Sequence, residues 1–412
     1  IYLNISDLAN QSKMFAFLAH EFQHLISFNQ KENLRNISDD VWLNELRSEY
    51  AVTLLGYNDI YDGSHLQRRV RALTENPSDS LTEWKNLPAD YGQIGLFGEY
   101  VAEHLSPQVI ADTLKNKSAG FNSLAESLIK NGHSETFTDI YRDWLIANFL
   151  NDGSVNTRFD YTKPALTDFR VVPTRTVANP GENTVLAVSD SLRDWQGTWD
   201  DVSQLQSGTN GVLKISFDSP SLASFYIFYL VFNPDGRYRL YDFNPAPGSK
   251  ELYISGIGLD FTRVVLMPVK KDKLSSFSSN ETPVSLTTSF ERIASAPLTA
   301  PIPEPIQTQI SPAPVIGSQP EPGTYNLEPG LSDGTLIRVR GGYKVYVIKD
   351  GWRRHIVNSR IFSFYPGLGF EKVIEVDPAV LSQYQESSLV RYAGGEKVYS
   401  VDGGARRWLN MS

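Results

Sequence analysis

At 412 residues the chain is longer than most single domains, so we expect two to four domains. Hydrophobic residues make up 41% and charged residues 21%, the balance of an ordinary globular protein, and no apolar run is long enough to predict a membrane-spanning helix. The net charge of −9 argues against nucleic acid as a partner, and the lack of cysteine excludes disulfides and thiolate metal ligands.

The chain opens with a short apolar run, residues 1–5, which predicts a strand leading into the first helix. Its first residue is not methionine, and Ser412 falls inside a repeat. We therefore expect both ends to be truncations, with part of the first domain lying before Ile1. The missing signal peptide then carries no information about the compartment.

The first helix is predicted over residues 14–28, where apolar side chains at helical spacing surround His20, Glu21 and His24. The four-residue spacing places both imidazoles on one face of a helix that we expect to be otherwise mostly buried. Two imidazole nitrogens are half of a tetrahedral zinc site, and Glu21 lies beside the position open to water. The motif predicts zinc binding with Glu21 as general base, although so short a motif also arises by chance.

A second helix is predicted over residues 38–51, after a polar connection at residues 29–37. It begins with residues that favour helix N-caps. Its carboxylates Glu45 and Glu49 lie four residues apart and therefore share one face. By residue type, either of them could supply a third metal ligand.

The two helices together resemble the gluzincin zinc metallopeptidases, through His20-Glu-Phe-Gln-His24 and the downstream Trp42-Leu-Asn-Glu45. The sequence of residues 18–30 is most similar to that of the hyicolysin-like branch. The resemblance implies that His20, His24 and Glu45 bind one catalytic zinc ion and that Glu21 acts as catalytic base and acid. A metzincin is not expected, because the Gly and third His of that pattern are absent.

Further residues are candidates for supporting roles. Asn44 precedes the ligand in the family pattern and is expected to orient the local backbone. Glu49, one turn after Glu45, is placed to accept the second ring proton of a histidine, or it is an ordinary surface carboxylate. Tyr91 begins a glycine-rich helix at residues 91–105 and is a candidate oxyanion donor, as in several zinc peptidases, or a packing residue. His65, in a polar stretch, is expected at the surface.

Changes in residue composition and periodicity along the chain predict the domain organisation. Residues 1–155 are expected to form the metallopeptidase domain. From residue 156 to 295, short β-branched and aromatic runs between turn residues predict an antiparallel β-sandwich with an accessory role. A structural or substrate-presenting sandwich is favoured, with carbohydrate or surface binding as the alternative. Residues 296–332 are a proline-rich linker that favours extended conformation.

The last segment, residues 333–412, contains two short repeats, the second of them truncated. Residues 336–356 align without gaps to residues 389–409, with 10 of 21 positions identical. Each copy predicts a β-hairpin and resembles the small Lys-Val-Tyr repeats of bacterial surface and exported proteins. Trp352, Trp408 and the paired arginines either bind a cell-surface or polysaccharide ligand or pack neighbouring repeats.

The sequence therefore predicts a multidomain α+β protein: a partial zincin-like, mainly helical lobe, a β-sandwich, a linker and hairpin repeats. The expected function is that of a secreted zinc endopeptidase that acts on protein or peptide substrates, outside the cell or at its surface. The alternative is a cell-surface binding or adhesion protein whose zinc site is degenerate or structural. Retention of Glu21 favours the enzyme, because a purely structural site has no need of a base.

Overall fold

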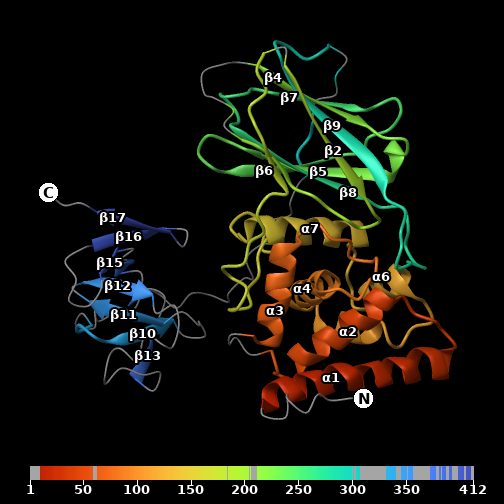
Figure 1. Cartoon of the computed structure of the whole chain (residues 1–412), viewed down its shortest axis with the longest axis vertical. Helices are drawn as coiled ribbons and strands as arrows, with labels where there is room; N and C mark the ends of the chain where they lie inside the picture. Colours follow the sequence, from red (N-terminus) through yellow and green to blue (C-terminus); the bar gives the residue numbers. More distant parts are fainter. Residues whose placement is uncertain are drawn as a thin grey trace, which may run out of the picture. The chain divides into compact units, whose positions relative to one another are not determined.

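The computed structural model divides the chain into two compact units, Ile1–Pro314 and Val315–Ser412, and each is described by itself (Figure 1). The strand expected at residues 1–5 and most of the proline-rich linker lie outside the described residues. No helix in the described part of the chain combines the length and apolar character of a membrane span. The described residues are 10–58, 63–182, 184–203, 205, 211–298, 300, 303–306, 331–339, 345–349, 351–355, 372–376, 380–381, 383–386, 389–391, 398–402 and 405–409.

Helices occupy the first half of unit 1 and strands the second, so the mixed α+β class expected from the sequence is confirmed. Side chains cap the helix starts: Asn10 accepts from the Lys13 amide, and Thr136 and Asp139 form a capping box. The helices are α1 (Gln11–Ser27), α2 (Val41–Leu54), α3 (His65–Glu75), α4 (Pro88–His104), α5 (Pro107–Asp112), α6 (Gly120–Lys130) and α7 (Phe137–Leu150).

The polar connection expected over residues 29–37 is partly wrong. The helical path of α1 continues into a π-helix, η2 (Phe28–Asn33), and the chain turns at Asn36, whose φ is 56°. Lys31 in η2 is buried and donates to Asn116 Oδ1 at 2.9 Å and to the Ser118 carbonyl at 2.7 Å. Both acceptors lie between α5 and α6, so these bonds attach the end of the first helix to the rest of the lobe.

Glycines in α4 allow close packing of this helix against α2 and α3. A Cβ added at Gly92 would lie 2.7 Å from the backbone nitrogen of Leu73 in α3, closer than real Cβ contacts come. At Gly95 the added atom would lie 3.3 Å from Arg69 Cγ and 3.6 Å from Glu49 Oε2. Gly95 therefore leaves the room in which α2 and α3 bring Glu49 and Arg69 together.

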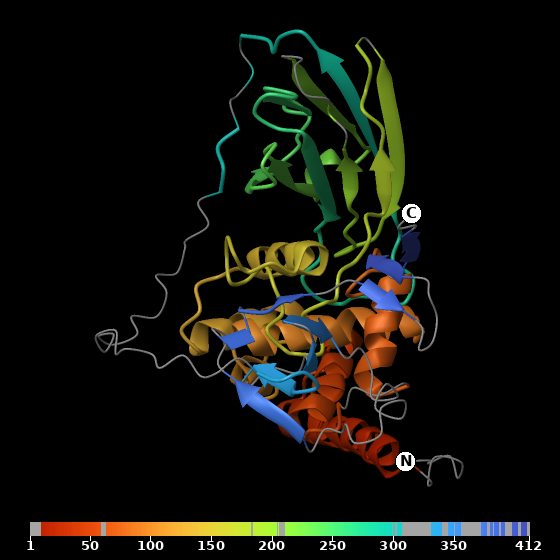
Figure 2. The ribbon, with the colours of Figure 1, turned by 90° about the vertical axis from the view of Figure 1, so that its left-hand side faces the viewer.

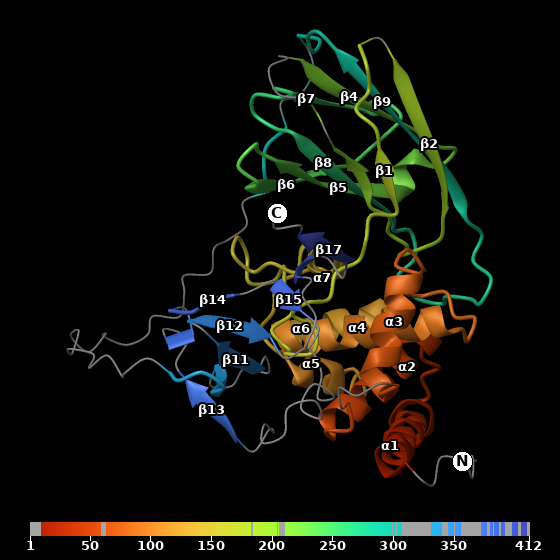
Figure 3. The same cartoon turned by 60° about the vertical axis from the view of Figure 1, so that its left-hand side comes forward.

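The strands of unit 1 form two facing sheets, seen one above the other in Figure 3. One sheet has the order β1-β3-β8-β5-β6 and the other β2-β9-β4-β7, with apolar side chains between them. All pairings are antiparallel except that of β1 with β3, which is parallel. The strands are β1 (Arg175–Val177), β2 (Val185–Leu192), β3 (Asp200–Val202), β4 (Val212–Asp218), β5 (Phe225–Phe232), β6 (Tyr238–Phe243), β7 (Glu251–Ser255), β8 (Arg263–Lys270) and β9 (Val284–Ile293).

The helix α7 joins the helical lobe to the sandwich and lies beneath the sheet that contains β5 and β6 (Figures 1 and 3). Trp144 of α7 shares one hydrophobic core with Leu230 of β5 and Met267 of β8. Tyr141 donates to the Trp195 carbonyl at 2.7 Å, across the same boundary. Helices and sheets thus belong to one compact unit, while the domain boundary near residue 155 stays a prediction.

Unit 2 contains a five-stranded sheet of order β13-β10-β11-β12-β14 and a three-stranded sheet β15-β16-β17. The hairpin expected in each sequence copy is present, since β11 pairs with β12 and β16 pairs with β17, both antiparallel. The strands are β10 (Leu336–Val339), β11 (Val345–Lys349), β12 (Trp352–His355), β13 (Val373–Val376), β14 (Gln385–Glu386), β15 (Leu389–Arg391), β16 (Val398–Asp402) and β17 (Ala405–Leu409).

Asp200 at the start of β3 makes the stability of unit 1 dependent on pH. Its side chain is fully buried, neither oxygen accepts a hydrogen bond within the described residues, and Arg175 Nε lies 3.2 Å from Oδ1. Burial raises the pKa of Asp200 to about 7 from an ordinary 3.8, although Arg175 opposes the shift. Because the folded pKa is the higher one, stability is lost as the pH rises from about 4 to about 7.

We expect Asp200→Asn to raise the free energy of unfolding at pH 8 by about 2–4 kcal/mol and to have little effect near pH 4. Urea unfolding at both pH values measures the difference. The matched control is Asp201→Asn, which removes the charge and one of the two oxygens that accept 2.8 Å bonds from Arg263, and which is expected to destabilise the protein at pH 8. A gain from Asp200→Asn that is equal at both pH values would show that the ionised carboxylate is not the cause.

Candidate metal centre

The buried face of α1 carries the two histidines of the motif. Its buried residues recur with the helical period and lie on one face: Ala16, Ala19, His20, Gln23 and Ser27. Alanine and serine at these positions keep the helix close to α2. His24 lies one turn after His20 and is partly buried. Both imidazoles therefore face α2, which carries the carboxylates.

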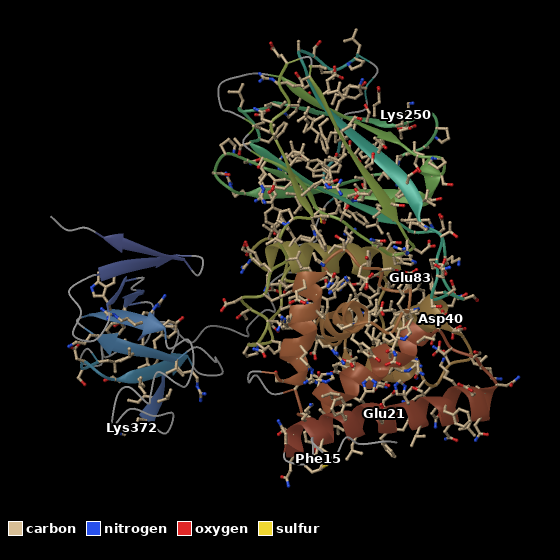
Figure 4. The ribbon with its side chains drawn as sticks, viewed as in Figure 1. Phe15, Glu21, Asp40, Glu83, Lys250 and Lys372 are labelled. Carbon is tan, nitrogen blue, oxygen red and sulfur yellow. The ribbon has the colours of Figure 1, made fainter. Side chains whose placement is uncertain are left out.

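The opposite face of α1 is exposed, so the expectation of an otherwise mostly buried helix is wrong. Phe22 is 60% exposed, and Phe15, Leu25 and Ile26 are exposed as well. Figure 4 labels Phe15 and Glu21 on this helix. The apolar residues around the motif predict the helix correctly, but only the α2-facing side of it is packed within the described residues.

Three ligand-type atoms converge where α1 meets α2. His20 Nε2 lies 3.1 Å from His24 Nε2 and 3.2 Å from Glu45 Oε2, and His24 Nε2 lies 3.5 Å from the same oxygen. Among the described residues this is the group of three whose candidate ligand atoms all lie within 4.8 Å of one another. The arrangement selects Glu45, not Glu49, as the carboxylate beside both Nε2 atoms.

The other nitrogen of each imidazole is held by a buried group on α2. His20 Nδ1 lies 3.2 Å from Glu49 Oε1, and His24 Nδ1 lies 3.1 Å from Ser48 Oγ. Ser48 donates its own proton to Gln23 Oε1 at 2.9 Å, which leaves an oxygen lone pair for the His24 N–H. These contacts favour the Nδ1–H tautomer of both rings when a metal ion is bound, which would direct both Nε2 lone pairs to the common centre.

Glu49 is the hub of a buried network that the sequence did not reveal. Its carboxylate accepts from Arg69 Nε and Nη2, each at 2.6 Å, and from His65 Nε2 at 2.7 Å. The expectation that His65 lies at the surface is wrong, because its side chain is buried against Glu49. The polar residues near His65 in the sequence belong to the exposed face of α3. Arg69, one turn later, lies on the same inner face.

The charges of the centre are strongly coupled. Burial lowers the pKa of His20, but the carboxylates of Glu45 and Glu49 outweigh burial and raise that pKa to about 9. Burial raises the pKa of Glu49, but Arg69, His20 and His65 together hold it well below its usual range. For Glu45, His20 and His24 likewise outweigh burial and lower the pKa. The ionised carboxylates of Glu45 and Glu49 therefore favour a positive charge at the centre, where both contact the His20 imidazole.

Glu21 and Asn44 stand outside the triangle of ligand-type atoms. Glu21 lies on α1 between the two histidines and is exposed, so its carboxylate is open to solvent. Asn44 precedes Glu45 on α2, and its backbone carbonyl oxygen lies 3.2 Å from Ser48 Oγ. Its side-chain Oδ1 is buried without a hydrogen-bond partner among the described residues. The backbone of Asn44, more than its side chain, therefore contacts the histidine supports.

Tyr91 lies beside the centre at the start of α4. Its ring centre is 6.4 Å from that of His20, and the Arg69 guanidinium stacks 4.5 Å above it. The hydroxyl donates to Asn86 Oδ1 at 2.9 Å. Burial, with the carboxylates of Glu45 and Glu49, raises the pKa of Tyr91 to about 12, so the hydroxyl keeps its proton at neutral pH.

The residues present fit a small divalent cation. Glu45 Oε2 is buried, and no hydrogen bond of acceptable geometry reaches it within the described residues. Zinc bonds of about 2.0–2.1 Å at tetrahedral angles separate neighbouring ligand atoms by about 3.3 Å. The observed separations of 3.1, 3.2 and 3.5 Å match that spacing. Two imidazoles and one carboxylate, with no thiol in the chain, are a donor set typical of catalytic zinc.

Trp352 and Arg353, two candidate ligand-binding residues of the repeats, differ in their exposure and packing. Trp352 is 41% exposed and remains available to a ligand. Arg353 instead packs within its own sheet, where its guanidinium lies 5.4 Å from the Tyr346 ring centre and Nη1 donates to the Leu381 carbonyl at 2.7 Å. The side chain of Trp408 lies outside the described part of unit 2. Packing thus accounts for Arg353, and the ligand of the repeats stays a prediction.

Comparison with known proteins gives distant likenesses. No family model matches the chain, and no curated protein does. A Yersinia pseudotuberculosis-derived mitogen is 8% identical over 27% of this chain and 87% of its own, with a TM-score of 0.19. An Aeromonas hydrophila periplasmic inhibitor of g-type lysozyme is 11% identical over 28% and 96%, with a TM-score of 0.18. A family GH115 4-O-methyl-α-glucuronidase is 10% identical over 60% and 39%, with a TM-score of 0.16. Values this low carry no argument about fold or function.

Proposed function

We propose that the chain carries the zinc centre of a secreted endopeptidase, with His20, His24 and Glu45 as ligands and Glu21 as general base. The observation that carries the proposal is the triangle of Nε2, Nε2 and Oε2 atoms at zinc-ligand spacing. Glu21, on the same helix and open to solvent, supplies what a purely structural site has no need of. The resemblance of the HEFQH and WLNE stretches to gluzincins supports the same assignment and a zincin-like helical lobe.

The chain's own residues divide the work of peptide hydrolysis. A bound zinc ion would act as Lewis acid on the scissile carbonyl and acidify the attacking water. Glu21 would take the proton from that water and deliver it to the leaving amine. Glu49 and Ser48 keep the imidazoles in one tautomer and orientation. Tyr91, protonated at neutral pH, could donate to the oxyanion once its hydroxyl leaves Asn86.

The location outside the cell belongs to the same proposal. Its support is the resemblance of the repeats to those of bacterial surface and exported proteins. Protein or peptide substrates are expected of a zinc peptidase centre. The β11–β12 hairpin, with its exposed Trp352, is a candidate for attachment to a surface polymer.

The function is tested by measuring zinc content together with casein hydrolysis. We expect about one zinc per chain, loss of hydrolysis on chelation and recovery when zinc is returned. Stoichiometric zinc without hydrolysis of casein or of a peptide library would favour the structural-site alternative. Absence of zinc binding would overturn the assignment of His20, His24 and Glu45.

Arg69 is expected to tune zinc affinity through Glu49. Arg69→Met removes the bidentate partner of Glu49 and should weaken zinc binding about 10–100-fold, the usual effect of disturbing a group behind a metal ligand. Competition with a chromogenic chelator measures the affinity. The matched control is Arg68→Met, because Arg68 makes an exposed hydrogen bond to the Gly63 carbonyl. Equal affinities of the two variants would contradict a role for Arg69 at the centre.

A further inference from the structure

The segment between α3 and α4 connects the sandwich to Tyr91. Figure 2 shows the sandwich above the helical lobe, and residues 80–87 make hydrogen bonds between the two. The Leu81 amide donates to the Trp195 carbonyl at 3.0 Å. The buried side chain of Glu83 accepts from the Glu281 amide, also at 3.0 Å. The sandwich therefore holds the first half of this segment in place.

The second half of the segment is held by Asp90, in the first turn of α4. The buried carboxylate of Asp90 accepts from the Lys85 amide at 3.1 Å and from the Leu87 amide at 2.6 Å. These two amides flank Asn86, whose φ of 60° lies in the left-handed region that asparagine tolerates better than most residues. The neighbours on both sides thus set the direction of the Asn86 side chain.

Asn86 contacts the hydroxyl of Tyr91, the residue after Asp90. The hydroxyl donates to Asn86 Oδ1 at 2.9 Å. The Tyr91 ring is held separately, by the Arg69 guanidinium 4.5 Å from its centre and by the Trp84 ring, which is 4.9 Å away and inclined by 75°. Because other contacts fix the ring, the bond to Asn86 governs the direction of the hydroxyl and not the place of the ring.

An asparagine amide suits a hydroxyl that must give away its proton. Oδ1 accepts the Tyr91 proton in the resting chain, and a half-turn of the exposed Asn86 amide would present Nδ2–H to the same hydroxyl oxygen. A phenol that accepts a hydrogen bond is a better donor, since neighbouring hydrogen bonds polarise one another. An aspartate in this place could only accept, so it would keep the proton from an oxyanion.

We propose that Asn86 is a positioning residue for Tyr91: its amide directs the tyrosine hydroxyl and, by turning, releases the proton to the oxyanion while supporting the phenol oxygen. The proposal rests on the peptidase function proposed above and deepens it, because it assigns the group that controls the oxyanion donor. It also gives the sandwich a part in the reaction, through the segment that carries Asn86.

The test compares kcat and KM of the zinc-loaded chain with those of Tyr91→Phe and Asn86→Asp on one fluorogenic peptide. We expect kcat to fall about 10²-fold in Tyr91→Phe, as on loss of an oxyanion donor, and about tenfold in Asn86→Asp, the effect of one hydrogen bond. KM should stay within about twofold in both variants, because the interaction belongs to the transition state. An undiminished kcat in Asn86→Asp would overturn the proposal.

The double variant separates action through Tyr91 from a general structural effect. In the Tyr91→Phe background, Asn86→Asp should cause no further loss of kcat, because the hydroxyl that Asn86 positions is already absent. A loss that adds to that of Tyr91→Phe would show that Asn86 acts in another way and would overturn the proposal.

Asn36→Asp is the matched control. Asn36 is likewise exposed and has a φ of 56°, but it follows η2 and its backbone amide donates to the Glu32 carbonyl. We expect this variant to keep the kcat of the unmodified chain. An equal loss in Asn36→Asp and Asn86→Asp would trace the effect to the added charge or to the left-handed backbone, and the proposal would fail.

A second measurement does not depend on catalysis. In a chain labelled with ¹³C at tyrosine Cζ, the NMR signal that disappears in Tyr91→Phe should shift in Asn86→Asp and stay in place in Asn36→Asp. A chain that hydrolyses peptides but whose Tyr91 signal is unmoved in Asn86→Asp contradicts this proposal alone. A chain that shows the expected shift but hydrolyses no peptide contradicts the proposed function, and the role of Asn86 with it.

Discussion

Glu21→Gln is expected to lower the rate of peptide hydrolysis by about 10³-fold while leaving zinc content unchanged. General acid–base catalysis by one side chain typically contributes 10²–10⁴-fold, and the amide of glutamine can neither take nor return a proton at neutral pH. Zinc should remain, because the three ligand-type atoms belong to His20, His24 and Glu45. Hydrolysis of a fluorogenic peptide and metal analysis on the same preparation measure the two effects.

The matched control is Glu32→Gln, an equal change at an exposed glutamate in η2. We expect full activity from this variant. If Glu21→Gln retains hydrolysis, Glu21 is not the base and the mechanism is wrong. If Glu21→Gln loses zinc together with activity, the carboxylate holds the metal, and the assignment of three ligands must change.

The parts of the site that lie within one helix could be predicted from the sequence. A four-residue spacing fixes the relative direction of His20 and His24, and the same spacing relates Glu45 to Glu49, because the helical period is a local property. The choice between Glu45 and Glu49 could not be made in this way. It depends on how α1 crosses α2, and the structure places Glu45 Oε2 at the Nε2 atoms and Glu49 Oε1 at His20 Nδ1.

The outer support of the site was not predictable, because it depends on contacts between separate elements. His65 and Arg69 reach Glu49 from α3, 16 and 20 residues further along the chain. Nothing in the polar sequence around them marks an inward face. Helix α3 does carry a signal in retrospect: His65 and Arg69 are four residues apart, the same spacing as His20 and His24.

The same division between local and distant information applies to the sandwich. Strongly apolar strands such as β5 give a clear strand signal, because β-branched and aromatic residues dominate them. Strand β3 has the sequence Asp-Asp-Val, and β9 has only Leu286 and Phe290 as buried apolar residues in its middle, so their sequences give a weaker signal. These strands exist because their neighbours offer complete hydrogen-bonding edges, which no local propensity encodes.

Zinc affinity should separate the carboxylate at the centre from the one behind it. We expect Glu45→Ala to weaken zinc binding by more than about 100-fold, because it removes a proposed ligand, whereas disturbing a supporting group typically costs 10–100-fold. Glu49→Gln should fall in that lower range, since the glutamine oxygen can still accept from His20 Nδ1 while its charge is lost. Zinc titration against a chelator of known affinity ranks the two variants.

Folding must be checked in both variants, because Glu49 is buried and its loss leaves Arg69 without a carboxylate partner. Urea unfolding in the absence of zinc provides that check, and Arg68→Met serves as a surface reference. The expected order of zinc affinity is unmodified chain, then Glu49→Gln, then Glu45→Ala, with the Glu45→Ala variant folded but metal-free at micromolar zinc. The reverse order of the two variants would assign the third ligand to Glu49. It would also require α1 to cross α2 differently, because in this structure Glu45 Oε2 lies 3.2 and 3.5 Å from the two Nε2 atoms.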